Sequence, residues 1–288
     1  MILSMTGFAG ATAELPGISL AVELRSVNHR YLDVTIKLPD ELRALETALR
    51  ERIGAAQRRG KVECRIAMAR TPAGTGTIAV NAERVRQLAD AARDITRVVP
   101  GTPPLAAADI LRWPGVMVEA SISADALAGQ VDELVSQALS ELNAAREREG
   151  RKLRDVLDAR CSDIDAQLRR IAPRVPALHA AYMDKLGSRL REAGLEPNDD
   201  RLKQELALFA TRIDVAEEVA RLATHVAEMR RVLAQGGTVG KRLDFLAQEL
   251  HREANTLGSK SVDAELSQVS LELKVLIEQM REQVQNLE

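Results

Sequence analysis

The chain has 288 residues, of which 45% are hydrophobic and 28% are charged, and its net charge is −2. This length is sufficient for one or two domains with buried cores. The near-neutral charge excludes a global field that attracts nucleic acid, so such a site would need a local basic patch. Aromatic residues make up only 2% of the chain, which argues against base-stacking modules such as the RRM and OB folds.

Cysteine usage and hydropathy indicate the compartment. Cys64 and Cys161 are far apart and form no CxxC motif, which suits a reducing compartment. The beginning of the chain lacks the charged and long apolar regions of a secretory signal, and no run approaches 18 apolar residues. We therefore expect a cytoplasmic protein that is neither secreted nor membrane-spanning.

Residues 2–71 show the alternation of apolar and polar residues that is typical of strands. Strands are predicted from Ile2 onward and over 18–27, 31–38 and 61–69, and a helix is predicted over 41–57. This pattern favours a few antiparallel strands with a helix packed on one face.

Residues 71–123 contain loops and short helices. The pattern predicts a loop at 71–77, an amphipathic helix at 81–96 capped by Asn81, and a Pro-rich hinge at 98–106. Trp113, the only tryptophan, is expected to be a buried anchor that packs a loop.

From residue 124 the chain is almost entirely helical. A heptad-like apolar seam runs from Val156 to Tyr182, with Pro173 and Pro176 expected to break it and Gly150 marking an earlier break. A turn is expected at 195–200, and a long antiparallel hairpin would allow one apolar seam to cover another.

The last third of the chain, 201–288, should form three helical pieces, because Gly236, Gly237, Gly240 and Gly258 interrupt it. The third piece carries a second seam, which is open to intramolecular bundle packing or to subunit contact. The fold class expected is α+β, with N-terminal antiparallel strands and packed helices, then a long helical hairpin and a C-terminal helical domain. The predicted domains are 1–155, a helical connector at 156–200, and 201–288.

Carboxylates and one imidazole recur at helical spacing in the first of these pieces. On a helical wheel, one face would hold Asp214, Glu217, Glu218, Arg221 and His225. These are ligand types that Mg²⁺, Mn²⁺ or Zn²⁺ accepts. A solvated face with i,i+4 ion pairs explains the same spacing.

The second piece adds Glu249 and Glu253, four residues apart at the border of its core stripe. A polar face opposite them contains Lys241, Asp244, Gln248, Arg252 and Asn255, and its amides are less usual for solvation alone.

Basic residues gather in two places. One group lies at strand ends and turns of the first domain and contains Arg25, His29, Arg30, Arg58, Arg59 and Lys61. The other lies in the last third and contains Arg230, Arg231, Lys241, Arg242, Arg252 and Lys260. Arginine suits phosphate oxygens. With few aromatics, we expect recognition of the RNA backbone and shape, although scattered solubilising charge gives the same pattern. No P-loop, GxGxxG or GxSxG motif is present.

Seven strings of the sequence resemble the YicC/YloC family, in order along the whole chain. They are SMTGFA (4–9), RSVNHRYLD (25–33), RGKVE (59–63), DILRWPGV (109–116), RIDVAEEVARLATH (212–225), GKRLDFLAQELHREANTLGSKS (240–261) and ELKVLIEQMREQVQNLE (272–288). The resemblance implies a bacterial cytoplasmic endoribonuclease that uses Mn²⁺ or Mg²⁺. It also implies a ring-like homo-oligomer, a hexamer, that clamps RNA.

Combining this resemblance with the residue chemistry gives the site hypothesis. The predicted catalytic residues are His225, Glu218 and Glu249, and the predicted metal ligands are Asp214, Glu217, Glu218, Glu249 and Glu253. The predicted RNA-binding residues are His29, Arg30, Arg59, Lys61, Arg221, Lys241 and Arg252. Two alternatives stay open: a non-catalytic RNA-binding adaptor, and an oligomeric scaffold without RNA affinity.

Overall fold

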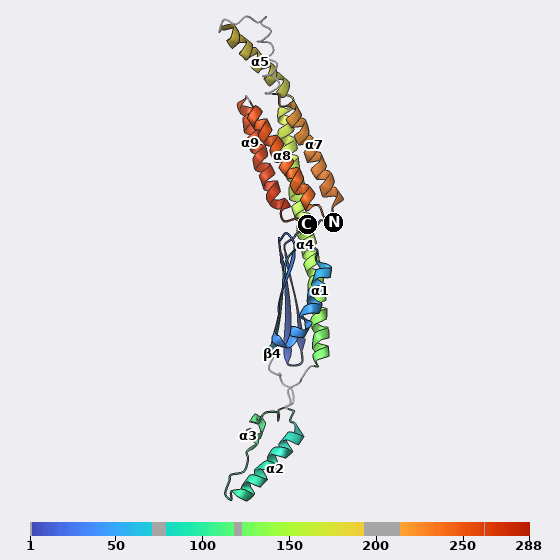
Figure 1. The fold of residues 1–288 in the computed structure, drawn as a ribbon, viewed down its shortest axis with the longest axis vertical. Coiled ribbons are helices and arrows are strands. Elements are labelled where there is room, and N and C mark those ends of the chain that lie inside the picture. The colour runs from blue at the N-terminus through green and yellow to red at the C-terminus, as the bar shows by residue number, and fades with distance from the viewer. Residues whose placement is uncertain (1, 71–78, 118–122, 193–213, 262) are drawn as a thin grey trace.

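The computed structural model describes residues 2–70, 79–117, 123–192, 214–261 and 263–288. It confirms the α+β class, since a four-stranded sheet near the N-terminus is followed by long helices. The molecule is elongated, with the sheet and a helical bundle arranged end to end (Figure 1). The expected loop at 71–77, the turn at 195–200 and residues 201–213 lie outside the described residues. Among the described helices, none is long and apolar enough to cross a membrane.

The sheet is mixed, which corrects the expectation of antiparallel strands only. Its order is β1 (Gly7–Leu15), β2 (Ile18–Val27), β4 (Gly60–Arg70) and β3 (Leu32–Lys37). The first two pairings are antiparallel, but β3 pairs with β4 in parallel. The cause is a crossover: the 3₁₀ helix η1 (Asp40–Leu45) and helix α1 (Glu46–Ala56) carry the chain back before β4 begins.

One face of the sheet forms the first core. Alternate side chains of the two central strands are buried on this face, for example Leu20, Val22 and Leu24 of β2. Helices α1 and α4 cover them, with Ile53 of α1 and Leu142 of α4 fully buried.

Helix α4 (Ala124–Ile171) links the sheet to the bundle (Figure 1). Its 48 residues give a length of about 72 Å at 1.5 Å per residue. The expected break at Gly150 is wrong, because this glycine lies inside the continuous helix, where a Cβ would collide with the carbonyl oxygen of Ile2. The expected break near the prolines is confirmed, since α4 ends at Ile171 and α5 (Val175–Glu192) follows.

The second half of α4 packs in a bundle with α7 (Ala216–Gln235), α8 (Gly240–Lys260) and α9 (Ala264–Val284). The division into three pieces is confirmed over the described residues from 214 onward, but α8 continues through Gly258 to Lys260 and α9 begins at Ala264. A Cβ at Gly258 would lie 2.5 Å from Ser270 Oγ, so this glycine permits close packing of α8 on α9. The seam of α9 is buried inside the bundle, which fits the intramolecular alternative.

Helices α2 (Ala82–Val98) and α3 (Ala107–Arg112) lie beyond the end of the sheet that is remote from the bundle (Figure 1). Asn81 caps α2 as predicted, since its side chain accepts a hydrogen bond from the Arg84 N–H at 3.1 Å. The prediction of a buried Trp113 is wrong, because this side chain is 50% exposed. Neither helix contributes a buried residue, so there is no local core for the indole to enter.

The two ends of the chain meet between the sheet and the bundle. The Met5 N–H donates to the Asn286 carbonyl at 2.8 Å, and the Glu288 N–H donates to the Leu3 carbonyl at 3.0 Å. Arg146 of α4 is buried beside them, with its guanidinium bonded to Ser4, Gln57 and Glu288. We call this group of contacts, over residues 2–5, Gln57, Arg146 and 285–288, the junction.

Candidate active site

The candidate site lies on the antiparallel hairpin of α7 and α8. Gly236 and Gly237 have φ values of 67° and 87°, which end α7 and turn the chain. Apolar residues hold the two helices together, including Leu222 and Val226 of α7 and Leu246 and Leu250 of α8. This packing fixes the register in which polar residues of the two helices meet.

Three of the predicted residues converge in the middle of this hairpin. His225 of α7 and Glu249 and Glu253 of α8 each offer one ligand atom, and these atoms lie within 4.8 Å of one another. Glu253 is buried, whereas His225 and Glu249 are partly exposed. A histidine nitrogen and two carboxylate oxygens form a donor set that suits Mn²⁺ or Zn²⁺, while Mg²⁺ prefers oxygen alone. We call these residues the carboxylate–histidine cluster.

Arg221 borders the cluster. Its Nη1 atom lies 3.5 Å from Glu253 Oε1, and its Nη2 atom lies 2.5 Å from Glu217 Oε1. The hydrogen bond and charge of Glu217, followed by those of Glu253, raise the pKa of Arg221 above its ordinary value. The guanidinium is therefore a fixed cation beside two carboxylates, in a place where it could also hold a phosphate oxygen.

Asp214 and Glu218 lie elsewhere, near the end of α8. Glu218 is buried, and its Oε1 atom lies 2.8 Å from Lys260 Nζ. Its Oε2 atom is buried without a hydrogen-bond partner among the described residues. Asp214 precedes α7, and its side chain accepts a hydrogen bond from the Ala216 N–H at 2.9 Å. Asp214 thus lies before the helix that was expected to include it, whereas Glu218, Arg221 and His225 follow one another along α7 and meet different residues of α8.

The polar face of α8 is largely satisfied along its own helix. Gln248 Nε2 donates to Asp244 at 2.8 Å, and Asn255 Nδ2 lies 3.0 Å from His251 Nδ1. Lys241 and Arg252 are exposed, and Arg252 Nη1 lies 3.8 Å from Glu249 Oε2. Arg252 is therefore close enough to the cluster to reach a phosphate bound there.

Of the first basic group, His29 and Arg30 follow β2, Arg59 directly precedes β4, and Lys61 is the second residue of β4. Arg59 Nε donates to the His29 carbonyl at 3.1 Å, and the Arg30 guanidinium lies 5.3 Å from the centroid of the Tyr31 ring. Lys61 is exposed. Asn28, which precedes His29, donates a hydrogen bond from its side chain to the Gln285 carbonyl at 2.6 Å. The segment after β2 therefore adjoins the junction and not the carboxylate–histidine cluster.

Two ion pairs across the hairpin were not predicted from the sequence. Lys260 pairs with Glu218 across the hairpin, and Glu228 of α7 pairs with Arg242 of α8 at 3.4 Å. The i,i+3 spacing of Glu228 and Arg231 could have indicated their bond, but the contacts between helices required the register of the hairpin.

The same family matches both halves of the chain. Residues 2–155 match "Endoribonuclease YicC-like, N-terminal region", and residues 171–288 match "Endoribonuclease YicC-like, C-terminal". The chain therefore belongs to the YicC-like endoribonuclease family, which confirms the resemblance drawn from its sequence strings.

Two relatives are similar over their full length. A protein of Haemophilus influenzae named "Probable endoribonuclease YicC" is 38% identical over 288 residues, and the match covers 100% of both chains. A protein of Clostridioides difficile with the same name is 28% identical over 295 residues, again with 100% of both chains covered. The division at residues 155 and 200 stays a prediction, since α4 runs through the first position and the second is outside the described residues.

Proposed function

We propose that this chain is an endoribonuclease that hydrolyses RNA phosphodiester bonds at the α7–α8 hairpin with the help of Mn²⁺ or Mg²⁺. The observation that carries the proposal is the convergence of His225, Glu249 and Glu253 from two helices to within 4.8 Å. The names of the two relatives support the reaction class. A cytoplasmic location remains part of this proposal.

Some residues of the hairpin would bind the metal, and others would bind the phosphate. Glu249 and Glu253 would hold the metal, with His225 as a third ligand or as the general base that takes a proton from water. A bound divalent metal supplies a water of lowered pKa and neutralises charge on the phosphate. Arg221, Arg252 and Lys241 would bind phosphate oxygens, while Arg30, His29, Arg59 and Lys61 would bind the RNA backbone near the junction.

Asp214, Glu217 and Glu218 have other partners in this structure: the Ala216 N–H, Arg221 and Lys260. Their proposed roles as ligands, and that of Glu218 in catalysis, would require these contacts to open. Glu218 has the strongest claim of the three, because one of its buried oxygens lacks a partner among the described residues.

The test is cleavage of an end-labelled structured RNA with Mn²⁺, with Mg²⁺ and with excess EDTA. Glu249→Ala should lower the rate at least about 100-fold, since a metal contributes several kcal/mol to the transition state. Glu218→Ala tests the catalytic role proposed for Glu218. Glu278→Ala is the control, because this exposed residue pairs with Arg281 on α9. Cutting that survives both EDTA and Glu249→Ala would overturn the proposed centre.

The adaptor alternative is favoured by one observation. Arg221 already neutralises Glu217 and Glu253, so the acidic residues could serve only to stabilise the hairpin. RNA binding without any cut in the same assay would support this alternative, and no RNA binding would support the scaffold.

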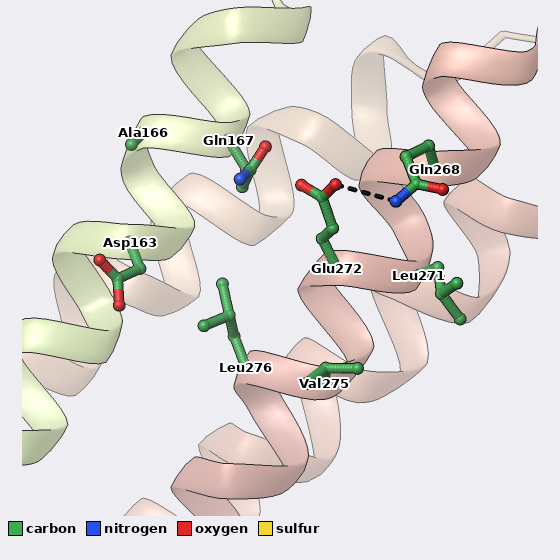
Figure 2. Close-up of a pocket in the computed structure, with 8 residues that line it drawn as sticks. All are labelled: Asp163, Ala166, Gln167, Gln268, Leu271, Glu272, Val275 and Leu276. Carbon is green, nitrogen blue, oxygen red and sulfur yellow. Dashed lines mark hydrogen bonds between the residues drawn. The ribbon is translucent and has the colours of Figure 1, made fainter.

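We also propose that copies of the chain assemble into a ring-like homo-oligomer. A groove of about 510 Å³ is lined by residues of α4 and α9, including Leu271, Val275 and Leu276 of α9. In Figure 2, Leu276 and Glu272 of α9 face Asp163 and Gln167 of α4. Leu271 and Val275 are mostly exposed, and Gln167 Oε1 is buried without a partner among the described residues. A second copy could cover these apolar side chains; the expected hexameric number rests on the family resemblance alone.

Leu271→Glu places a charge in this groove and should lower the native mass, measured by light scattering. Val156→Glu is the matched control, since Val156 is also an exposed apolar residue but lies on α4 away from the groove. An unchanged mass for Leu271→Glu would exclude this groove as the subunit contact.

A further inference from the structure

The aromatic residues that the structure describes lie outside its two cores. Neither core contains a Phe, Tyr or Trp among the described residues. Phe8, Tyr31, Trp113 and Phe245 are 62%, 64%, 50% and 49% exposed. Aromatic side chains usually dominate core packing, so those on the surface are candidates for contact with a ligand.

Phe245 is the one beside the candidate active site. It lies on α8 four residues before Glu249 and eight before Glu253. Residues four apart on a helix are neighbours on one face, separated by about one 5.4 Å turn. The ring is therefore about one helical turn from the carboxylate–histidine cluster.

An arginine is fixed against this ring. The Arg242 guanidinium lies 5.6 Å from the Phe245 centroid. Glu228 of α7 holds Arg242 at 3.4 Å and itself accepts hydrogen bonds of 2.7 and 2.9 Å from Arg231. The aromatic–arginine pair is thus positioned by a network that spans the hairpin, with its orientation set before any ligand binds.

The surroundings of Phe245 favour a nucleic acid over a protein partner. Its neighbours on α8 are charged or polar: Lys241, Arg242, Asp244, Gln248, Glu249 and Arg252. No apolar patch continues from the ring along this helix surface. Aromatic rings flanked by cations are the arrangement on which unpaired bases stack while the phosphates are neutralised.

We propose that Phe245 and Arg242 form a stacking subsite for an unpaired nucleobase, one helical turn from the cleavage centre. This inference rests on the proposed function and specifies its substrate as RNA with a single-stranded nucleotide next to the scissile phosphate. It departs from the sequence-based expectation that recognition uses only the RNA backbone and shape.

The test uses a single-stranded RNA oligonucleotide that carries the fluorescent base 2-aminopurine, with EDTA present to prevent cleavage. The wild type should quench the fluorescence, because stacking on an aromatic ring does so. Phe245→Leu should abolish the quenching and weaken binding about tenfold, whereas Phe245→Tyr should retain both. Trp113→Leu is the control, since it removes an equally exposed aromatic side chain at the end of α3, and α3 lies far from the hairpin (Figure 1).

Equal affinity and quenching for the wild type and Phe245→Leu would overturn the subsite. A change in the native mass of Phe245→Leu would also overturn it, because Phe245 would then be a subunit contact. Quenching that depends on Phe245 in a protein that never cuts RNA would support the subsite and overturn the proposed cleavage. RNA cleavage that Phe245→Leu leaves unchanged, together with no quenching by the wild type, would support the proposed cleavage and overturn the subsite.

Discussion

At the scale of single residues, Glu228 shows how the hairpin fixes its charges. The hydrogen bond from Arg231 and the nearby charges of Arg231 and Arg242 lower the pKa of this carboxyl from 4.5 to about 2, although desolvation opposes the shift. Because the folded-state pKa lies below the ordinary value, the stabilisation is complete above about pH 4.5 and is lost as the pH falls to about 2.

A carbon-13 NMR titration of the Glu228 carboxyl should therefore give a midpoint near 2. Arg231→Gln removes the main donor and should move that midpoint toward 4.5, while Arg97→Gln, at an exposed ion pair of α2, should leave it unchanged. A wild-type midpoint near 4.5 would show that the Glu228 network does not persist in solution.

The sequence supplied the residue types of the candidate site but not their partners. Spacing along one helix grouped Asp214 with His225, yet α7 begins only at Ala216. The cluster of His225, Glu249 and Glu253 depends on the register between two helices. That register is set by core side chains such as Leu222 and Leu250, and no pattern within one helix encodes it.

At the scale of elements, replacing Gly150 by alanine should lower the stability of the protein, although alanine has the higher helix propensity. Alanine stabilises an exposed helix position by about 1 kcal/mol relative to glycine. At Gly150, however, the added Cβ would collide with the Ile2 carbonyl, so Gly150→Ala should destabilise the protein by about 1–3 kcal/mol. Urea unfolding measures the change.

Gly129→Ala is the matched control on the same helix, since a Cβ there meets nothing within 4 Å. This variant should be neutral or more stable by up to about 1 kcal/mol. Equal effects of the two substitutions would mean that residues 2–5 do not pack against α4 in solution.

Most strands and helices were predictable, because alternation and heptad spacing reflect burial directly. The two errors about glycine share a physical cause. Gly150 and Gly258 were interpreted as helix breaks, but each lies where another part of the chain approaches the helix closely. The parallel pairing of β3 with β4 also depends on a crossover whose path the strand pattern does not specify.

At the scale of the whole molecule, Arg146 joins the sheet to the bundle. Its side chain is buried and donates to Ser4, Gln57 and Glu288. Arg146→Ala would leave these acceptors unpaired in the junction and should cost about 3–5 kcal/mol of unfolding free energy.

Arg154→Ala is the control, since its ion pair with Asp155 is exposed and is worth under about 1 kcal/mol. Thermal unfolding of both variants compares them. If Arg146→Ala were as stable as Arg154→Ala, the junction would not hold the two parts together.

The meeting of the chain ends has a consequence for the order of assembly during synthesis. Residues 2–5 are made before the strands of the sheet, but Leu3 and Met5 form backbone hydrogen bonds with Glu288 and Asn286. The strands of the sheet can pair as soon as β4 has emerged, whereas the segment before them must wait until nearly 280 further residues have been made. The contact that sets the sheet against the α7–α8 hairpin therefore forms late, and the sheet and the hairpin can each be complete before this contact joins them.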